Sequence, residues 1–206
     1  MEYDRENDYD KYLHIWEGQT VKHSNAQIFY GKWKVEDFET PKDTFFYFGA
    51  DWGFSQDPTT LIRCFVKDKN LYIDYEAYGV GVDIDLTPNL FDDIPESRKY
   101  QIIADSARPE TISYMSKQGF KVVKCKKYSG SVEDGIQKIR GFEKVIIHPR
   151  CKNVVYEFRT YCYKVDALTG IISSVIEDKN NHCIDAIRYA IDNINRKSAV
   201  VKLTGW

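Results

Sequence analysis

The feature that most limits the fold of this chain is an uninterrupted apolar run, residues 45–50 (FFYFGA), which ends at Asp51. A short run without polar alternation is typical of a β-strand that is buried on both faces. Residues 59–66 and 71–78 also have strand-like sequences, and a polar turn joins them. Three strands separated by short turns indicate an antiparallel meander.

After the meander, predicted helices and strands alternate along the chain. Helices are expected at 82–94, 110–118, 131–142, 152–162 and 181–196, strands at 101–104, 120–125 and 145–148, and a hairpin at 162–177. Strands that follow a helix lie parallel to their neighbours, and their connections are right-handed. The sequence therefore predicts an α/β fold: a mixed sheet of five or more strands, flanked by helices on both faces. Ribonuclease-H-like nucleases and transposases share this architecture.

The composition is that of a globular protein. The 206 residues, 43% of them hydrophobic, are enough for one sizeable domain and exclude bulk disorder. No apolar run approaches the roughly 18 residues of a membrane span, and the acidic N-terminus differs from a secretory signal. The five cysteines are odd in number and lack C-x-x-C spacing, which indicates reduced thiols. Residues 1–43 are predicted to be a linker and docking arm, and 44–206 one domain.

Two aspartates follow predicted strands directly. Asp51 ends the first strand and Asp105 follows 101–104. If these strands are parallel neighbours, both carboxylates emerge at the carboxyl edge of the sheet, where open α/β sheets bind ligands. Two carboxylates about 4 Å apart repel each other by roughly 4 kcal/mol, which a cation offsets. Carboxylate oxygens in an open site favour Mg²⁺ or Mn²⁺. The alternative is that each aspartate only caps a turn or helix.

A third aspartate, Asp185, lies in the last predicted helix. The isoleucines of this helix form a stripe that should face the core, and Asp185 projects away from it together with His182. A histidine three residues before an aspartate can share a metal ion or orient a water molecule. Spacing alone favours the other interpretation, in which Asp185 lies on a solvated helix face.

A lysine-rich segment follows the fifth predicted strand. Lys124, Lys126 and Lys127 precede the helix that begins near Ser131. Lysine side chains beside a helix N-terminus suit contacts with phosphate groups. The alternative interpretation is a solvated edge strand. Because the net charge is only −2, any nucleic-acid surface must be local rather than global.

Other enzyme classes lack their motifs in this sequence. There is no G-x-x-x-x-G-K-[ST] phosphate loop and no G-x-S-x-G elbow, which argues against a P-loop ATPase and an α/β-hydrolase. Cys183 adjoins His182, but adjacent helical residues point apart, so a thiol–imidazole dyad is not expected.

Together these residues resemble the C-terminal nuclease domain of phage terminase large subunits, especially those of short-tailed, headful-packaging phages. The resemblance covers about residues 45 to 193. The matching motifs, in order, are 49–54 (GADWGF), 57–59 (DPT), 104–107 (ADSA), 109–110 (PE), 126–127 (KK), 130–131 (GS), 134–136 (DGI) and 181–190 (NHCIDAIRYA).

This resemblance implies a ribonuclease-H-like fold and an endonuclease that cuts concatemeric double-stranded viral DNA at the start and end of packaging. It implies metal ligands at Asp51, Asp105 and Asp185, a supporting His182, and two Mg²⁺ or Mn²⁺ ions. The implied partners are DNA, an N-terminal packaging ATPase domain, the portal and the small terminase subunit, and the implied location is the host cytoplasm. Two alternatives remain open: a catalytically idle DNA-binding or portal-docking module, and another ribonuclease-H-like nuclease such as a junction resolvase.

Overall fold

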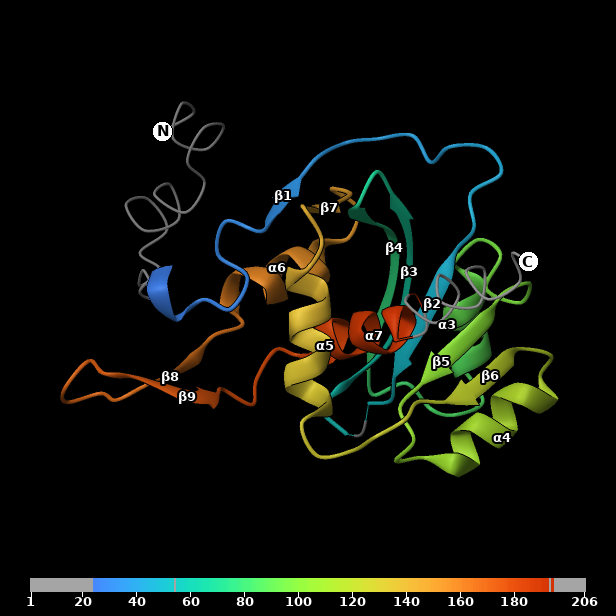
Figure 1. The fold of residues 1–206 in the computed structure, drawn as a ribbon. Helices are drawn as coiled ribbons and strands as arrows, with labels where there is room; N and C mark the ends of the chain where they lie inside the picture. The colour runs from blue at the N-terminus through green and yellow to red at the C-terminus, as the bar shows by residue number, and fades with distance from the viewer. Residues whose placement is uncertain (1–23, 54, 193, 195–206) are drawn as a thin grey trace, which may run out of the picture.

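A seven-stranded mixed sheet forms the centre of the computed structural model, which describes residues 24–53, 55–192 and 194 (Figure 1). The strand order is β1-β7-β4-β3-β2-β5-β6. These strands are β1 (Trp33–Val35), β2 (Tyr47–Asp51), β3 (Pro58–Lys67), β4 (Asn70–Val80), β5 (Gln101–Ala104), β6 (Lys121–Lys124) and β7 (Val145–Ile147). The α/β architecture predicted from the sequence is confirmed, with two more strands than the minimum of five.

The predicted directions of the strands are also confirmed. β2, β3 and β4 form the antiparallel meander. β5 lies parallel to β2, and β6 lies parallel to β5. β7 pairs in parallel with β4 on the other side of the meander. The carboxyl ends of β2, β5 and β6 therefore meet at the same rim of the sheet.

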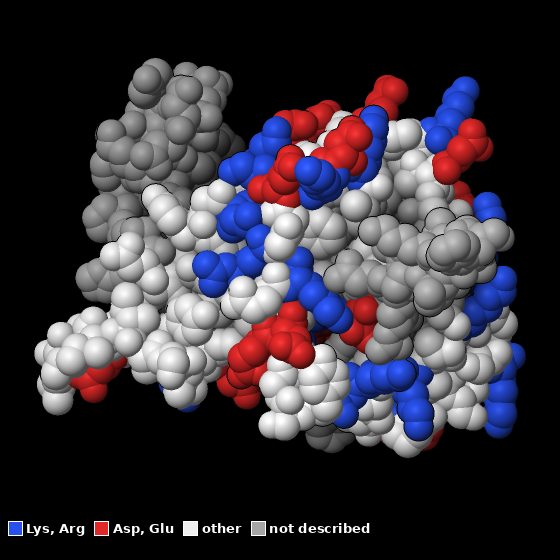
Figure 2. Space-filling model, viewed as in Figure 1, with Lys and Arg blue, Asp and Glu red and all other residues white. Residues whose placement is uncertain are grey.

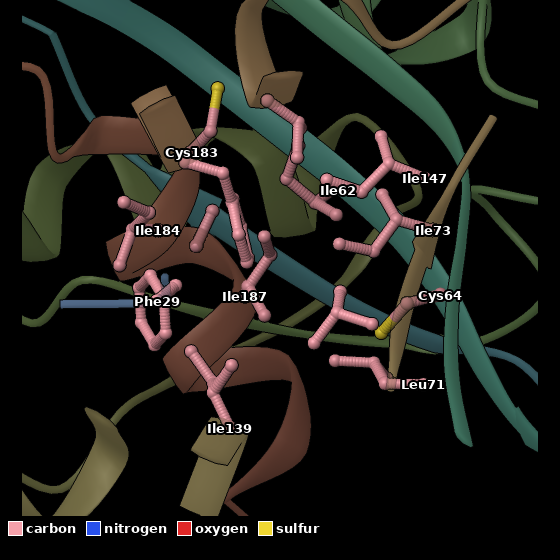
Figure 3. Close-up of a cluster of buried hydrophobic side chains, with 14 of the residues drawn as sticks. Phe29, Ile62, Cys64, Leu71, Ile73, Ile139, Ile147, Cys183, Ile184 and Ile187 are labelled. Carbon is pink, nitrogen blue, oxygen red and sulfur yellow. The ribbon is translucent and has the colours of Figure 1, made fainter. Parts of the chain in front are cut away.

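Helices cover both faces of the sheet. They are α3 (Thr87–Asp92), α4 (Pro109–Lys117), α5 (Ser131–Arg140), α6 (Lys152–Thr160) and α7 (His182–Ile191), with a 3₁₀ turn, η1 (Ser24–Ala26), near the start of the described chain. Phe91 of α3 and Met115 of α4 are buried against one face. The opposite face is covered by α5, α6 and α7, whose buried apolar side chains pack with β3 and β4 in one cluster (Figure 3).

Helix boundaries differ from the expected ones for local reasons. The helix expected over 82–94 is limited to α3, where Pro88 lies in the first turn and residues 93–100 form turns instead. The hairpin expected over 162–177 is present as β8 (Tyr163–Val165) and β9 (Ile172–Ile176), with Gly170 at φ +69° in the connection. The last helix is described to Ile191, so its expected extension to 196 falls largely outside the described residues.

Part of the segment predicted as a docking arm lies within the sheet. β1 pairs in parallel with β7, and Ile28 and Phe29 are buried in the core. Sequence analysis did not predict β1 because it has only three residues and one of them is a lysine. Residues 24–43 thus pack with the domain, whereas 1–23 lie outside the described residues, and a docking role for them stays a prediction. In the part of the chain that the structure describes, no helix is long and apolar enough to cross a membrane.

Candidate active site

Asp51 and Asp105 lie side by side at the carboxyl rim of the sheet. The register pairs Ala50 of β2 with Ala104 of β5, and the backbone N–H of Asp105 donates to the carbonyl oxygen of Ala50 over 3.0 Å. The indole N–H of Trp52 donates to the carbonyl oxygen of Asp105 over 2.9 Å. These backbone contacts show the adjacency that the strand order predicted. Both aspartates are buried.

Helix α7 brings Asp185 to the same rim. α7 packs directly on β2, because Gly49 has no side chain and the helix backbone at Ala186 lies against it. Asp185 precedes this contact by one residue. The structure half-buries Asp185, which argues against a fully solvated helix face, and its role as a metal ligand stays a prediction.

Every one of the three carboxylates has a cationic or imidazole partner. The pairs are Asp51 with His182, Asp105 with Lys127, and Asp185 with Arg188. Nδ1 of His182 lies 3.0 Å from Oδ2 of Asp51, and Nη2 of Arg188 lies 2.8 Å from Oδ1 of Asp185. Each of these contacts engages one oxygen of its carboxylate. Among the described residues, no three His, Cys, Asp or Glu side chains are arranged to hold a metal ion as they stand.

The pKa shifts show that the carboxylates share one electrostatic environment. Burial raises the pKa of Asp51, and the charge of Asp105 raises it further. Burial raises the pKa of Asp185 to about 6, with a further contribution from Asp51. The pKa of Tyr189 is raised first by burial and then by all three carboxylates, which places them around one side chain of α7. The hydrogen bond that His182 donates to Asp51 raises the pKa of His182.

This donor set fits a hard divalent cation. Buried carboxylates that repel each other and sit at an open rim provide the oxygen ligands that Mg²⁺ and Mn²⁺ prefer. Asp51, Asp105 and Asp185 are the residues that would hold such an ion. An ion bound there would take over the charge compensation that Lys127 and Arg188 now provide to two of the carboxylates.

The predicted phosphate-binding lysines lie next to this site. Lys124 ends β6 and pairs in register with Ala104, the residue before Asp105. Lys126 and Lys127 follow it, and all three residues are exposed. Lys127 reaches back to Asp105, whereas Lys124 and Lys126 border the rim. Figure 2 shows that basic and acidic side chains lie next to each other on the face that it draws.

Comparison with known proteins identifies the family. Residues 51–193 match the family model described as the terminase RNase H-like domain. The chain belongs to this family. It is 34% identical to the PBSX phage terminase large subunit of Bacillus subtilis (strain 168) over 70% of this chain and 34% of that protein. It is 31% identical to the terminase large subunit of Bacillus phage SPP1 over 92% of this chain and 46% of that protein.

A solved terminase structure has the same fold. The crystal structure of the g2p (large terminase) nuclease domain from bacteriophage SPP1 with bound Mn has a TM-score of 0.71 and 25% identity, and the match covers 80% of this chain and 97% of that one. The present chain therefore spans less than half the length of the two full-length terminase subunits but nearly all of this terminase nuclease domain.

Sequence reasoning missed two side chains of this site. Arg188 lies three residues after Asp185, a helical spacing that favours an ion pair and would have indicated it. The second side chain is Asp57, whose Oδ1 lies 3.7 Å from Nε2 of His182. Its position in the turn after β2 gives no periodic signal, so only the folded structure indicates this contact.

Proposed function

We propose that this chain is the nuclease domain of a viral terminase large subunit, a metal-dependent endonuclease. Its substrate would be concatemeric double-stranded DNA, cut when genome packaging begins and ends. The observation that carries the proposal is the convergence of Asp51, Asp105 and Asp185 at one rim of the sheet in a chain of the terminase family. The Mn reported for the SPP1 nuclease domain supports a metal site in this fold.

The three carboxylates would act as the metal ligands. Mg²⁺ or Mn²⁺ ions, two in the proposed mechanism, would lower the pKa of the attacking water and stabilise the leaving 3′ oxygen. Oδ2 of Asp51 would accept a hydrogen bond from Nδ1–H of His182 and so fix the orientation of the imidazole ring. The other ring nitrogen of His182 faces Asp57, and we assign His182 the role of orienting the water molecule.

The lysines beside the rim would hold the DNA backbone. Lys124 and Lys126 are exposed, and Lys127 would exchange Asp105 for a phosphate group when a metal ion neutralises that carboxylate. Contacts to phosphates carry no base information, so cleavage would have weak sequence preference. In the complete protein, the packaging ATPase domain, the portal and the small terminase subunit would be the partners, in the host cytoplasm.

Nicking of supercoiled plasmid in Mn²⁺ tests the proposal. Asp51→Asn is expected to abolish nicking because it removes a charged ligand while preserving the size of the side chain. Asp68→Asn is the matched control, because Asp68 is exposed in the β3–β4 turn and asparagine tolerates its φ of 50°. Activity in the presence of EDTA, or in Asp51→Asn, would refute the metal mechanism.

The same assay separates the alternatives. An idle DNA-binding module would bind duplex DNA with equal affinity in the wild type and in Asp51→Asn, and neither would cleave it. A junction resolvase or hybrid nuclease would prefer four-way junctions or RNA–DNA hybrids when these are offered beside linear duplex DNA. Cleavage of duplex DNA as the preferred substrate is the outcome expected for the terminase domain.

A further inference from the structure

Arg188 of α7 is a buried arginine that has no assigned role in the proposed reaction. Its exposed fraction is 6%. Nε and Nη2 lie 3.0 Å and 2.8 Å from Oδ1 of Asp185, and Nη1 donates to the carbonyl oxygen of Ser131 over 3.0 Å. Ser131 begins α5, so the guanidinium joins the first turn of α5 to a carboxylate of α7. A buried charge with this many fixed contacts has little freedom to move.

Helix α5 contains a glycine where the arginine passes. A Cβ on Gly135 would lie 2.6 Å from Cδ, 2.9 Å from Cγ and 3.1 Å from Cβ of Arg188. Glycine is unfavourable inside a helix, and Gly135 does not have a positive φ that would require it. Glycine at position 135 therefore leaves the space that the Arg188 side chain occupies, which explains why a glycine lies inside this helix.

We propose that Arg188 is a positioning residue for Asp185: α5 holds the guanidinium through Gly135 and the Ser131 carbonyl, and the guanidinium fixes the carboxylate in its place at the rim. This inference rests on the proposed function, because it gives Asp185 the role of a metal ligand. Partners that hold a metal ligand by hydrogen bonds typically change metal affinity by about 10–100-fold when removed.

A charge effect and a positioning effect have opposite signs here. If Arg188 acted only as a positive charge near the metal, its removal would strengthen the binding of a divalent cation. If it positions Asp185, its removal weakens binding. Gly135→Ala separates the two further, since it displaces the arginine side chain without removing any charged group.

Calorimetric titration of the 206-residue chain with Mn²⁺ at pH 8, without DNA, measures this directly. Arg188→Met and Gly135→Ala are each expected to weaken Mn²⁺ binding by about tenfold or more, the lower end of the range for such partners. Arg188→Lys should restore part of the affinity, because one ammonium cannot reach both Asp185 and the Ser131 carbonyl with the geometry of a guanidinium. Arg140→Met, on the exposed side of α5, is the control and should bind Mn²⁺ as the wild type does.

The outcomes distinguish this inference from the proposed function. Wild-type affinity in folded Gly135→Ala, or tighter binding in Arg188→Met, would overturn the positioning role while leaving the metal site intact. Absence of Mn²⁺ binding to the wild type would overturn both. Circular dichroism without metal shows whether each variant is folded, and should Arg188→Met fail to fold, Gly135→Ala and Arg188→Lys decide the result.

Discussion

The backbone of Gly49 in β2 touches the backbone of Ala186 in α7: an added Cβ would lie 1.8 Å from the carbonyl oxygen of Ala186 and 2.6 Å from the amide nitrogen of Ala190. These are backbone atoms of a helix and cannot rotate away. The contact places Asp185 at the rim that Asp51 occupies. Glycine is therefore required at this position for reasons of space.

Gly49→Ala is expected to destabilise the domain by about 3 kcal/mol or more, because α7 must move away from the sheet. Urea unfolding followed by circular dichroism measures the change. Gly79→Ala in β4 is the matched control, since its added Cβ would meet a side-chain methyl group of Val82, which can shift. Equal unfolding free energies for the two variants would contradict the proposed tight contact.

Glu157 of α6 gives the domain a pH-dependent stability. Burial raises the pKa of Glu157 to about 7, although its Oε2 accepts the N–H of Ile184. Because the folded-state pKa lies above the usual 4.5, its contribution to stability is complete below about pH 4.5 and is lost as the pH rises through about 7.

Glu157→Gln should remove this loss, because the amide is uncharged and its oxygen can still accept the N–H of Ile184. Relative to the wild type, the variant is expected to gain up to about 3 kcal/mol of unfolding free energy between pH 5 and pH 8. Urea unfolding across this range measures the difference. Glu133→Gln, on the exposed side of α5, is the control, and its unfolding free energy should change with pH as that of the wild type does. A difference independent of pH would show that Glu157 ionises normally.

Divalent cations should stabilise the folded domain. Mn²⁺ at 100 times its dissociation constant adds about 2.7 kcal/mol if it binds only the folded state. The melting temperature, measured by scanning calorimetry, is expected to rise in Mn²⁺ and return to its original value in EDTA. Asp105→Asn should remove most of the rise, whereas Asp68→Asn should retain it. An unchanged melting temperature at millimolar Mn²⁺ would count against a metal site at this rim.

Lys126 should contribute one phosphate contact to DNA binding. Lys126→Ala is expected to weaken binding of duplex DNA of any sequence and to reduce the slope of log K against log salt by about 0.9. Fluorescence anisotropy in EDTA, which prevents metal-dependent cleavage, measures both. Lys67→Ala is the control, because Lys67 lies at the far end of β3 from the rim. Thr60, which pairs with Asp51, lies near the other end of that strand. An unchanged slope in Lys126→Ala would show that Lys126 makes no phosphate contact in the complex with DNA.

The meander, the place of β5 beside it and the adjacency of Asp51 and Asp105 were predictable from the sequence. Apolar runs and short turns fix the meander, and right-handed crossovers then leave β5 beside β2. The isoleucine stripe of α7 likewise predicted which side of the helix faces the core. These features depend on local periodicity and on general rules of chain connection, which a single sequence carries.

The contacts between side chains were less accessible to sequence reasoning. Lys127 was predicted to face phosphate, and the structure also joins it to Asp105, because a long side chain can reach across the rim. The role of Gly49 depends on a helix 137 positions later in the chain, as counted to Ala186, so nothing near Gly49 in the sequence indicates it. Contacts of this kind follow from tertiary packing alone.

The position of α7 has a consequence for the order of events during synthesis. The ribosome makes β2 before α7, and α7, which covers Gly49 and carries Asp185, is the last helix or strand in the order of the described elements. Until α7 leaves the ribosome, that face of β2 has no cover and only two of the three acidic groups exist. If Asp185 has the proposed role of a metal ligand, a nascent domain has no complete site until α7 has been made.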